Sequence, residues 1–142
     1  MRLWHIDLIP YLPKSQLLAQ WRELNSIFKK QDKHILINYI YNYSDHYLFD
    51  YTCAVLNELI KRNIKTNTSN CYCYFYLFGN YGTIEIKNKY DYKFKEHNNE
   101  YLTICYWNLR EKYIRGQKDF TKEIWDKLDK FYKEKQVYVL DR

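Results

Sequence analysis

The chain has 142 residues, a formal net charge of +6 and a pI of about 9.0, and 46% of its residues are hydrophobic. This apolar fraction excludes an intrinsically disordered chain, and the length suits one domain over residues 1–142 with one core. Gly (3) and Pro (2) are scarce, which favours helices over a many-stranded barrel. The positive charge is compatible with nucleic acid, with acidic lipid or with no polyanion, so charge alone assigns no partner.

The first elements expected are an arm and a helix. Residues 1–12 should be an extended arm that ends near Pro10, and a helix should begin at Pro13–Ser15 with Ser15 as its cap. Its apolar stripe has spacings of four, three and four: Leu17, Trp21, Leu24 and Phe28. Glu23 falls on another strip of this helix, flanked by Gln16, Gln20 and Ile27. The acid therefore lies beside a basic face that carries Arg22, Ser15, Ser26, Lys29 and Lys33.

The next segment, HILINYIYNY (34–43), fits a short strand or an ordered loop. A second helix should follow, with Ser44 as N-cap, Lys61 and Arg62 in its last turn and Asn63 as its stop. Its broad apolar face comprises Leu48, Phe49, Thr52, Val55, Leu56, Leu59 and Ile60.

Residues 64–95 have the least regular pattern. CYCYFYLF, GNYG and TIEIKNKY fit a β-hairpin around Gly79–Gly82, and a long irregular loop rich in Tyr is the alternative. The two close cysteines, Cys71 and Cys73, do not have zinc-knuckle spacing. We therefore expect four reduced thiols and no metal site.

A third helix should begin near Asn98 or Asn99 and end at Gly116, and a fourth, FTKEIWDKLDKFYKEK, should be capped near Asp119. The tail QVYVL should pair with another extended segment or pack on the core. The expected fold is mainly α: a single compact domain of three to four helices, with an extended N-terminal arm and an optional small β-hairpin.

The sequence contains none of the common catalytic or nucleotide-binding motifs. G-x-S-x-G, the P-loop, the dinucleotide fingerprint and H-E-x-x-H are all missing, and the four histidines are scattered. No signal peptide and no membrane-spanning apolar run is recognisable, so we expect a cytoplasmic protein with no membrane partner. These residues by themselves indicate only a basic helical domain.

An ordered set of short matches goes further. LLAQWREL (17–24), followed by Phe28 and then Lys33-His34, resembles the start of the phage-type pyrimidine dimer DNA glycosylases. The start MRLWHIDLIPYLP, with KH and then NY (Asn38, Tyr39), is similar to a cellular branch of that family. AVLNELIKRNI resembles its second helix and LREK (109–112) the basic segment of its third. The resemblance covers residues 1–62, and residues 64–100 offer no match.

The resemblance implies a reaction and assigns residues to it. The family removes a base from ultraviolet-damaged DNA: an N-terminal α-amine attacks C1′, forms an imine with deoxyribose, and β-elimination nicks the strand. Met1 would supply the amine and Glu23 would be the catalytic acid/base. An α-amine has a pKa of about 7.7–8.0, so it is partly neutral and nucleophilic at working pH. The reaction requires no metal and no cofactor.

The same resemblance assigns contacts to DNA. Arg2, Arg22, Lys33, His34 and Lys112 match or adjoin basic residues of the family and would bind damaged double-stranded DNA, with the protein acting as a monomer. Aromatic residues such as Trp4, Trp107 and Tyr113 could stack on bases, or could belong to the core.

Two departures from the family bear on mechanism and substrate. Met1 is followed by Arg2, which disfavours removal of Met1, whereas the phage branch attacks with a small residue exposed by that removal. Ser26 stands where the phage branch has an arginine, which leaves the lesion preference open. The alternatives are therefore a non-catalytic DNA-binding module, or a lyase for another damaged base.

Overall fold

The computed structural model describes residues 2–79 and 90–140. Within these ranges the chain is helical and has no strand, so the expected mainly α class is confirmed. In chain order the elements are η1 (Ile6–Tyr11), α1 (Lys14–Lys30), η2 (Asn38–Asn42), α2 (Asp45–Lys61), α3 (Ser69–Gly79), α4 (Asn99–Ile114) and α5 (Lys122–Leu140), where η marks 3₁₀-helices.

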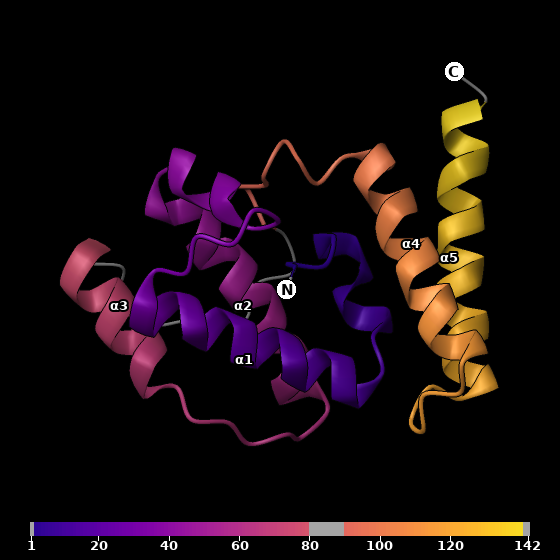
Figure 1. The fold of residues 1–142 in the computed structure, drawn as a ribbon, viewed down its shortest axis with the longest axis horizontal. Helices are drawn as coiled ribbons and strands as arrows, with labels where there is room; N and C mark the ends of the chain where they lie inside the picture. Colours follow the sequence, from indigo (N-terminus) through magenta and orange to yellow (C-terminus); the bar gives the residue numbers. More distant parts are fainter. Residues whose placement is uncertain (1, 80–89, 141–142) are drawn as a thin grey trace.

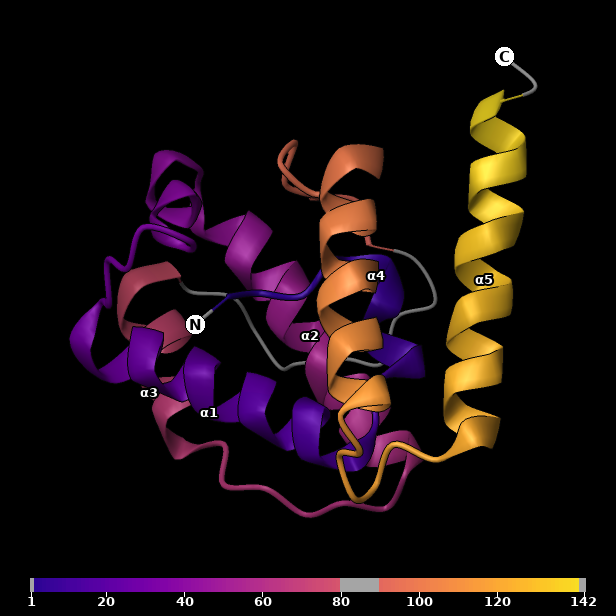
Figure 2. The ribbon, with the colours of Figure 1, turned by 45° about the vertical axis from the view of Figure 1, so that its right-hand side comes forward.

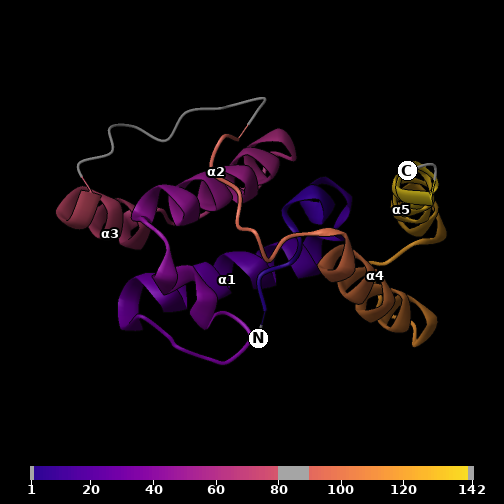
Figure 3. The same cartoon turned by 90° about the horizontal axis from the view of Figure 1, so that it is seen from above.

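The helices form two groups with the N-terminal segment between them. α1, α2 and α3 contact one another, and α4 packs against α5 as an antiparallel pair (Figure 1). η1 contacts both α2 and α5 and so joins the two groups, as Figure 2 and Figure 3 show from other directions. The N-terminal segment is therefore part of the interior of the fold.

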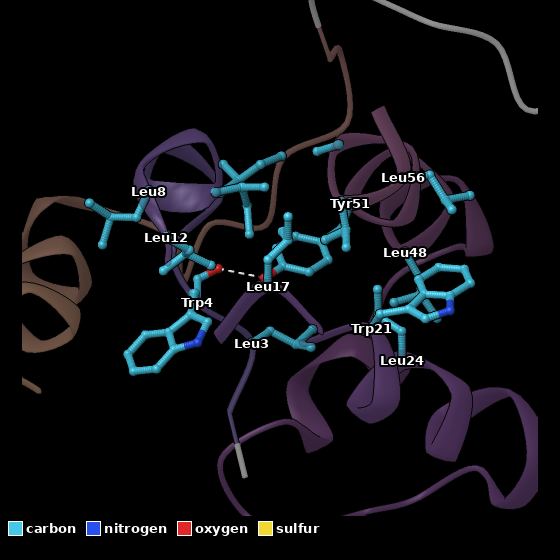
Figure 4. Packing of buried hydrophobic residues seen from close by; sticks show 14 of the residues in the cluster. Leu3, Trp4, Leu8, Leu12, Leu17, Trp21, Leu24, Leu48, Tyr51 and Leu56 are labelled. Carbon is cyan, nitrogen blue, oxygen red and sulfur yellow. Dashed lines mark hydrogen bonds between the residues drawn. The ribbon is translucent and has the colours of Figure 1, made fainter. Parts of the chain in front are cut away.

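The core draws on both the N-terminal segment and the helices. Leu3 and Leu8 are fully buried and belong to one hydrophobic cluster with Leu17 and Leu24 of α1 and Tyr51 of α2 (Figure 4). Burying side chains of this size stabilises the fold by about 1.5–3 kcal/mol each. The first residues of the chain are thus fixed by the same apolar contacts that hold α1 on α2.

Two helices begin and end as their sequences predict. α2 begins directly after Ser44 and is followed by Asn63 with φ of 58°, and α4 is capped by Asn98, whose side chain accepts from the Tyr101 N–H. Gly116 follows α4 with φ of 85°, a conformation that glycine adopts without strain. The prediction that Ile60 belongs to the buried face of α2 is wrong, because its side chain is exposed.

Four expectations about local structure are corrected. Residues 71–78 belong to α3 instead of a hairpin strand or an irregular loop. Residues 34–43, expected as a short strand or an ordered loop, form a turn and η2, so the strand alternative is wrong. The N-terminal arm is extended only to His5 and then turns into η1, and QVYVL continues α5 as helix. The described residues therefore contain five α-helices where three to four were expected, and the other half of the proposed hairpin, TIEIKNKY, lies outside them except for Tyr90.

The caps of α1 and α5 also differ from those expected. Ser15 lies inside α1, and the side chain of Asp119, expected to cap the last helix, accepts hydrogen bonds from Ser15 N (2.6 Å) and Oγ (2.7 Å) instead. Thr121 takes the place of Asp119 at α5, where its hydroxyl accepts from Ile124 N at 3.3 Å. The loop between α4 and α5 thus caps α1 across the molecule.

Candidate active site

Glu23 lies on one face of α1 together with Gln16, Ala19 and Gln20. Their spacing places all four side chains on a single strip of the helix, and all four line the same pocket. The placement of Glu23 beside Gln16 and Gln20, apart from the Leu17–Trp21–Leu24 stripe, agrees with the sequence pattern. α1 therefore directs its carboxylate away from the core and into a concave site.

The wall opposite α1 is built by the N-terminal segment and α4. Arg2 and Trp4 line the pocket from the first, and Asn108 and Lys112 line it from the second, since their spacing of four places them on one helix face. The pocket has a volume of about 250 Å³. Three of the residues expected at the site, Arg2, Glu23 and Lys112, are thus brought together from distant parts of the chain.

A buried glutamine holds the N-terminal segment against α1. The Gln20 side chain, 1% exposed, accepts from Trp4 N at 2.7 Å and donates to the Arg2 carbonyl at 3.2 Å. Gln20 therefore pairs with both backbone groups that flank Leu3. Because Gln20 lies one turn before Glu23, this clamp fixes the chain at Arg2 next to the carboxylate.

Two tyrosines complete the clamp from other helices. The Tyr51 hydroxyl of α2 lies 2.7 Å from the Trp4 carbonyl and 3.0 Å from Gln20 Oε1, the first contact being the dashed line in Figure 4. The Tyr101 hydroxyl of α4 donates to the Leu3 carbonyl. Arg2 then lies with its guanidinium 5.8 Å from the Trp4 ring and 6.0 Å from the Tyr101 ring, which limits its freedom.

The carboxylate of Glu23 is in an unusual electrostatic position. Its Oε2 is buried and has no hydrogen-bond partner among the described residues. Burial raises the pKa of Glu23 above its ordinary value, and the nearby Asp32 acts in the same direction, whereas His34 and Arg22 oppose the rise. A buried, unpaired carboxylate oxygen is costly for stability, and such atoms are concentrated at functional sites.

The remaining basic residues lie around the pocket. Arg22, Lys33 and His34 are exposed, and none of them lines the pocket, although His34 and Arg22 lie within electrostatic reach of Glu23. Ser26, at the position of the phage arginine, bonds Asp32 at 3.4 Å and so helps to hold the loop that carries Lys33 and His34. Met1, the expected nucleophile, lies outside the described residues.

Several residues of the site have no role in the sequence interpretation. The sequence pattern identified Gln20 only as a neighbour of Glu23, although a residue three positions before the acid lies on the same helix face and can line the same site. Asn108, four residues before Lys112, could have been predicted beside Lys112 by the same spacing. No local pattern distinguishes Tyr51 or Tyr101 from the chain's 17 tyrosines, because their hydroxyls bind backbone groups 47 and 98 residues away.

The described residues contain no group of three or more His, Cys, Asp or Glu side chains close enough to ligate a metal. All four cysteines are free thiols; Cys53, Cys71 and Cys105 are buried and Cys73 is exposed. In the part of the chain that the structure describes, we find no helix with the length and apolar character needed to cross a bilayer.

Comparison with known proteins bears on the N-terminal half. Residues 1–70 match the sequence profile of the family described as pyrimidine dimer DNA glycosylase. Neither the curated proteins nor the solved structures contain a match. The matched region includes η1, α1, η2 and α2, and with them Arg2, Gln20 and Glu23. Residues 1–70, just under half of the 142-residue chain, are therefore similar to the pyrimidine dimer DNA glycosylase family.

Proposed function

We propose that this protein is a DNA repair glycosylase with abasic-site lyase activity on ultraviolet-induced pyrimidine dimers. Its nucleophile is the α-amine of Met1 and its acid/base is Glu23. Its partner is damaged double-stranded DNA inside the cell, on which it acts as a single-domain monomer without a cofactor. The observation that carries the proposal is Glu23 Oε2, which has no partner in the described part of the chain and lies in a pocket shared with Arg2 and Lys112.

In the first half of the proposed reaction, the enzyme's amine replaces the nucleobase at C1′. The neutral amine attacks C1′ of the 5′ nucleotide, and the C1′–N bond to the base breaks as the base leaves with the electron pair and takes up a proton. The attached amine then loses one of its protons, O4′ gains one as the C1′–O4′ bond breaks, and the product is a protonated imine between the amine and C1′. The ionised Glu23 carboxylate stabilises both the cationic sugar and this imine, because its negative charge lies in the pocket where these positive charges develop.

The second half breaks the strand. A base removes a proton from C2′, whose acidity is increased by the neighbouring imine, and the 3′ phosphate leaves with the electrons of the C3′–O bond. Water then hydrolyses the imine and restores the amine. A carboxylate with a raised pKa suits the proton transfer, since it holds a proton more readily than an ordinary glutamate does at the same pH.

The clamp around Arg2 supports the choice of nucleophile. Gln20 and Tyr101 bind the backbone of Arg2 and Leu3, and Gln20 lies one helical turn from Glu23. Consecutive Cα atoms are only about 3.8 Å apart, and the residue that carries the proposed amine is bonded directly to Arg2, which this clamp holds at α1. Positioning of this kind supplies a large share of the rate enhancement in imine-forming enzymes.

The proposed contacts to DNA follow from the basic residues around the pocket. Lys112 and Arg2 line it and would bind phosphates beside the reacting sugar, and Arg22, Lys33 and His34 would bind the flanking backbone. A dimer weakens stacking and pairing, which lowers the cost of exposing C1′ to the amine.

Borohydride trapping tests the chemistry directly, because it reduces the imine to a stable amine. The wild-type protein should give a covalent adduct with abasic duplex and with duplex that contains a cyclobutane dimer. Glu23→Gln should lower the trapping rate by about 10²–10⁴-fold, the usual contribution of a positioned acid/base. Glu134→Gln, at an exposed position of α5, is the matched control and should behave as the wild type.

Mass analysis of the trapped adduct identifies the nucleophile. Trypsin should release the modification on the Met1–Arg2 dipeptide, and acetylation of the N-terminus should abolish trapping. An adduct at a lysine would contradict the assignment of Met1. Salt-dependent DNA binding without any adduct would identify a non-catalytic DNA-binding module, and trapping with abasic but not with dimer-containing duplex would indicate a lyase for another damaged base.

A further inference from the structure

Among the described residues, the most exposed large apolar side chain lies in the loop between α1 and η2. Ile35 is 78% exposed and the neighbouring Leu36 is 42% exposed. Two adjacent exposed aliphatic side chains differ from the rest of this region, where α1 and η2 bury their aliphatic residues. Two exposed side chains are too few to mark a contact surface by themselves, so the case depends on how the loop is held, on its charges and on its position.

The loop that carries Ile35 is held in one conformation by hydrogen bonds. His34 N donates to Asp32 Oδ1 at 3.2 Å, and the Tyr41 hydroxyl donates to the Asp32 carbonyl at 2.6 Å. The N–H groups of Ile37 and Asn38 both donate to the His34 carbonyl at 2.9 Å, and Ile37 is fully buried. Ile35 is therefore a fixed protrusion, and its insertion into a partner would lose little conformational entropy.

Positively charged side chains surround the tip of the loop, which we define as Ile35 and Leu36, and such charges favour binding of a polyanion. Lys29 and Lys30 end α1, Lys33 and His34 precede Ile35, and all four are exposed. Asp32 is the one acid between residues 24 and 44, and it is engaged in the hydrogen bonds of the loop. The apolar tip is thus flanked by basic side chains.

The loop also lies beside the candidate active site. It turns back alongside α1 after Lys30 (Figure 3), and both Asp32 and His34 act electrostatically on the Glu23 carboxylate. A molecule that occupies the pocket around Glu23 therefore extends over the loop, if it is as large as a DNA duplex.

We propose that Ile35 is a wedge that enters the damaged duplex between base pairs next to the reacting sugar. This inference rests on the proposed function, because it takes DNA as the partner. Extruding a nucleotide costs a few kcal/mol of stacking, and an apolar side chain that fills the gap offsets part of that cost. Lys33 and the lysines at the end of α1 then bind the phosphates on either side.

The size of the feature also argues for DNA. A stable contact between two copies buries about 800 Å² on each, which two aliphatic side chains surrounded by like charges cannot provide. Acidic lipid shares the charge of DNA, but lipid would give no reason for the loop to be fixed beside Glu23.

Duplex opening can be measured without the chemistry. A duplex that contains a tetrahydrofuran abasic analogue, which cannot form an imine, carries 2-aminopurine at the adjacent base step. Wild-type protein should raise the 2-aminopurine fluorescence, and Ile35→Ala should lower this rise and weaken binding about tenfold, because part of the apolar area of the wedge is no longer buried. Ile35→Leu should restore both.

A trapping comparison separates opening from catalysis. Ile35→Ala should slow borohydride trapping about tenfold on abasic duplex and leave it unchanged on a single-stranded abasic oligonucleotide, which has no stack to open. Ile60→Ala, also at an exposed isoleucine but on α2 and outside the pocket, is the matched control and should equal the wild type in every assay.

The outcomes distinguish the wedge from the proposed chemistry. If the wild type opens the duplex and forms no adduct, the lyase proposal fails and the wedge stands. If adducts form and Ile35→Ala opens the duplex as well as the wild type does, the wedge is wrong. If Ile35→Ala still opens the duplex but no longer binds phosphatidylserine vesicles, the tip binds lipid instead. If Ile35→Ala still opens the duplex but dissociates a dimer, the tip contacts a second copy of the chain instead.

Discussion

At the scale of single residues, Glu23 and Gln20 show how far a sequence pattern reaches. Helical spacing predicts that both lie on one strip of α1, apart from the apolar stripe, and the structure agrees. The pattern cannot predict that Gln20 is buried by the N-terminal segment, or that Glu23 Oε2 is left without a partner among the described residues. Both properties depend on the N-terminal segment and α4, which pack opposite this face of α1.

His97, a half-buried histidine just before α4, gives a prediction for stability. Its Nδ1 accepts from Ile6 N at 3.2 Å, its Nε2 lies 2.7 Å from the Tyr39 hydroxyl, and burial together with the neighbouring His5 lowers its pKa to about 3. The unfolded chain has an ordinary histidine pKa of about 6.5 and therefore binds an extra proton below that pH. The stability that neutral His97 contributes is complete above about pH 6.5 and is lost progressively down to about pH 3.

Urea unfolding across this pH range measures the effect. His97→Gln, which cannot titrate, should show a pH dependence of the unfolding free energy that is smaller by up to about 1.4 kcal/mol per pH unit between pH 6.5 and 3. The absolute stability of the variant does not enter the comparison. Equal slopes for the two proteins would show that His97 protonates as readily in the folded state as in the unfolded one.

At the scale of elements, α2 and α4 follow from local sequence, whereas α3 does not. α2 and α4 have polar residues at their starts and a positive-φ residue after their ends, so their limits are encoded locally. CYCYFYLF is apolar or aromatic throughout, which hides any period. Burial of Cys71, Tyr74 and Phe75 at helical spacing, with both rings against Phe28 of α1, selects the helix.

The cap of α1 by Asp119 is the clearest prediction at this scale. Burial alone would raise the pKa of Asp119, but hydrogen bonds from Ser15 prevail and lower it, as expected for a carboxylate at a helix N-terminus. Asp119→Ala should destabilise the protein by about 1–2 kcal/mol, the usual cost of losing such a cap, measured by urea unfolding. Asp126→Ala on the exposed face of α5 should change stability by less than about 0.5 kcal/mol. Similar losses in both variants would mean that the cap contributes nothing specific.

At the scale of the whole molecule, the distribution of the positive charge matters more than its sum. The formal charge of +6 does not say where a polyanion would bind. The fold places Arg2 and Lys112 in one pocket, with Arg22 and His34 within electrostatic reach of Glu23. The proposed DNA surface therefore consists of residues 2–34 together with part of α4. α5 contributes cations that line no part of this pocket.

Salt dependence of DNA binding tests this distribution. The logarithm of the affinity for duplex should fall linearly with the logarithm of the salt concentration. Lys33→Ala and Lys112→Ala should each reduce the slope by about 1, since each removes one phosphate contact. Lys130→Ala on α5 should leave the slope unchanged. An equal reduction in all three variants would indicate binding to the overall charge instead of to a surface around Glu23.

The sequence by itself determined the helical class, the limits of α2 and α4, the strip of α1 that carries Glu23, and the similarity of the first 70 residues to a glycosylase family. These are properties of neighbours within a few turns of helix, where spacing and capping act directly. The tertiary structure alone decided that Asp119 caps α1, that residues 71–78 are helical, and that Gln20, Tyr51 and Tyr101 hold the N-terminal segment beside Glu23. Each of these joins groups far apart in the chain, and such contacts form only when burial of a common core brings the helices together.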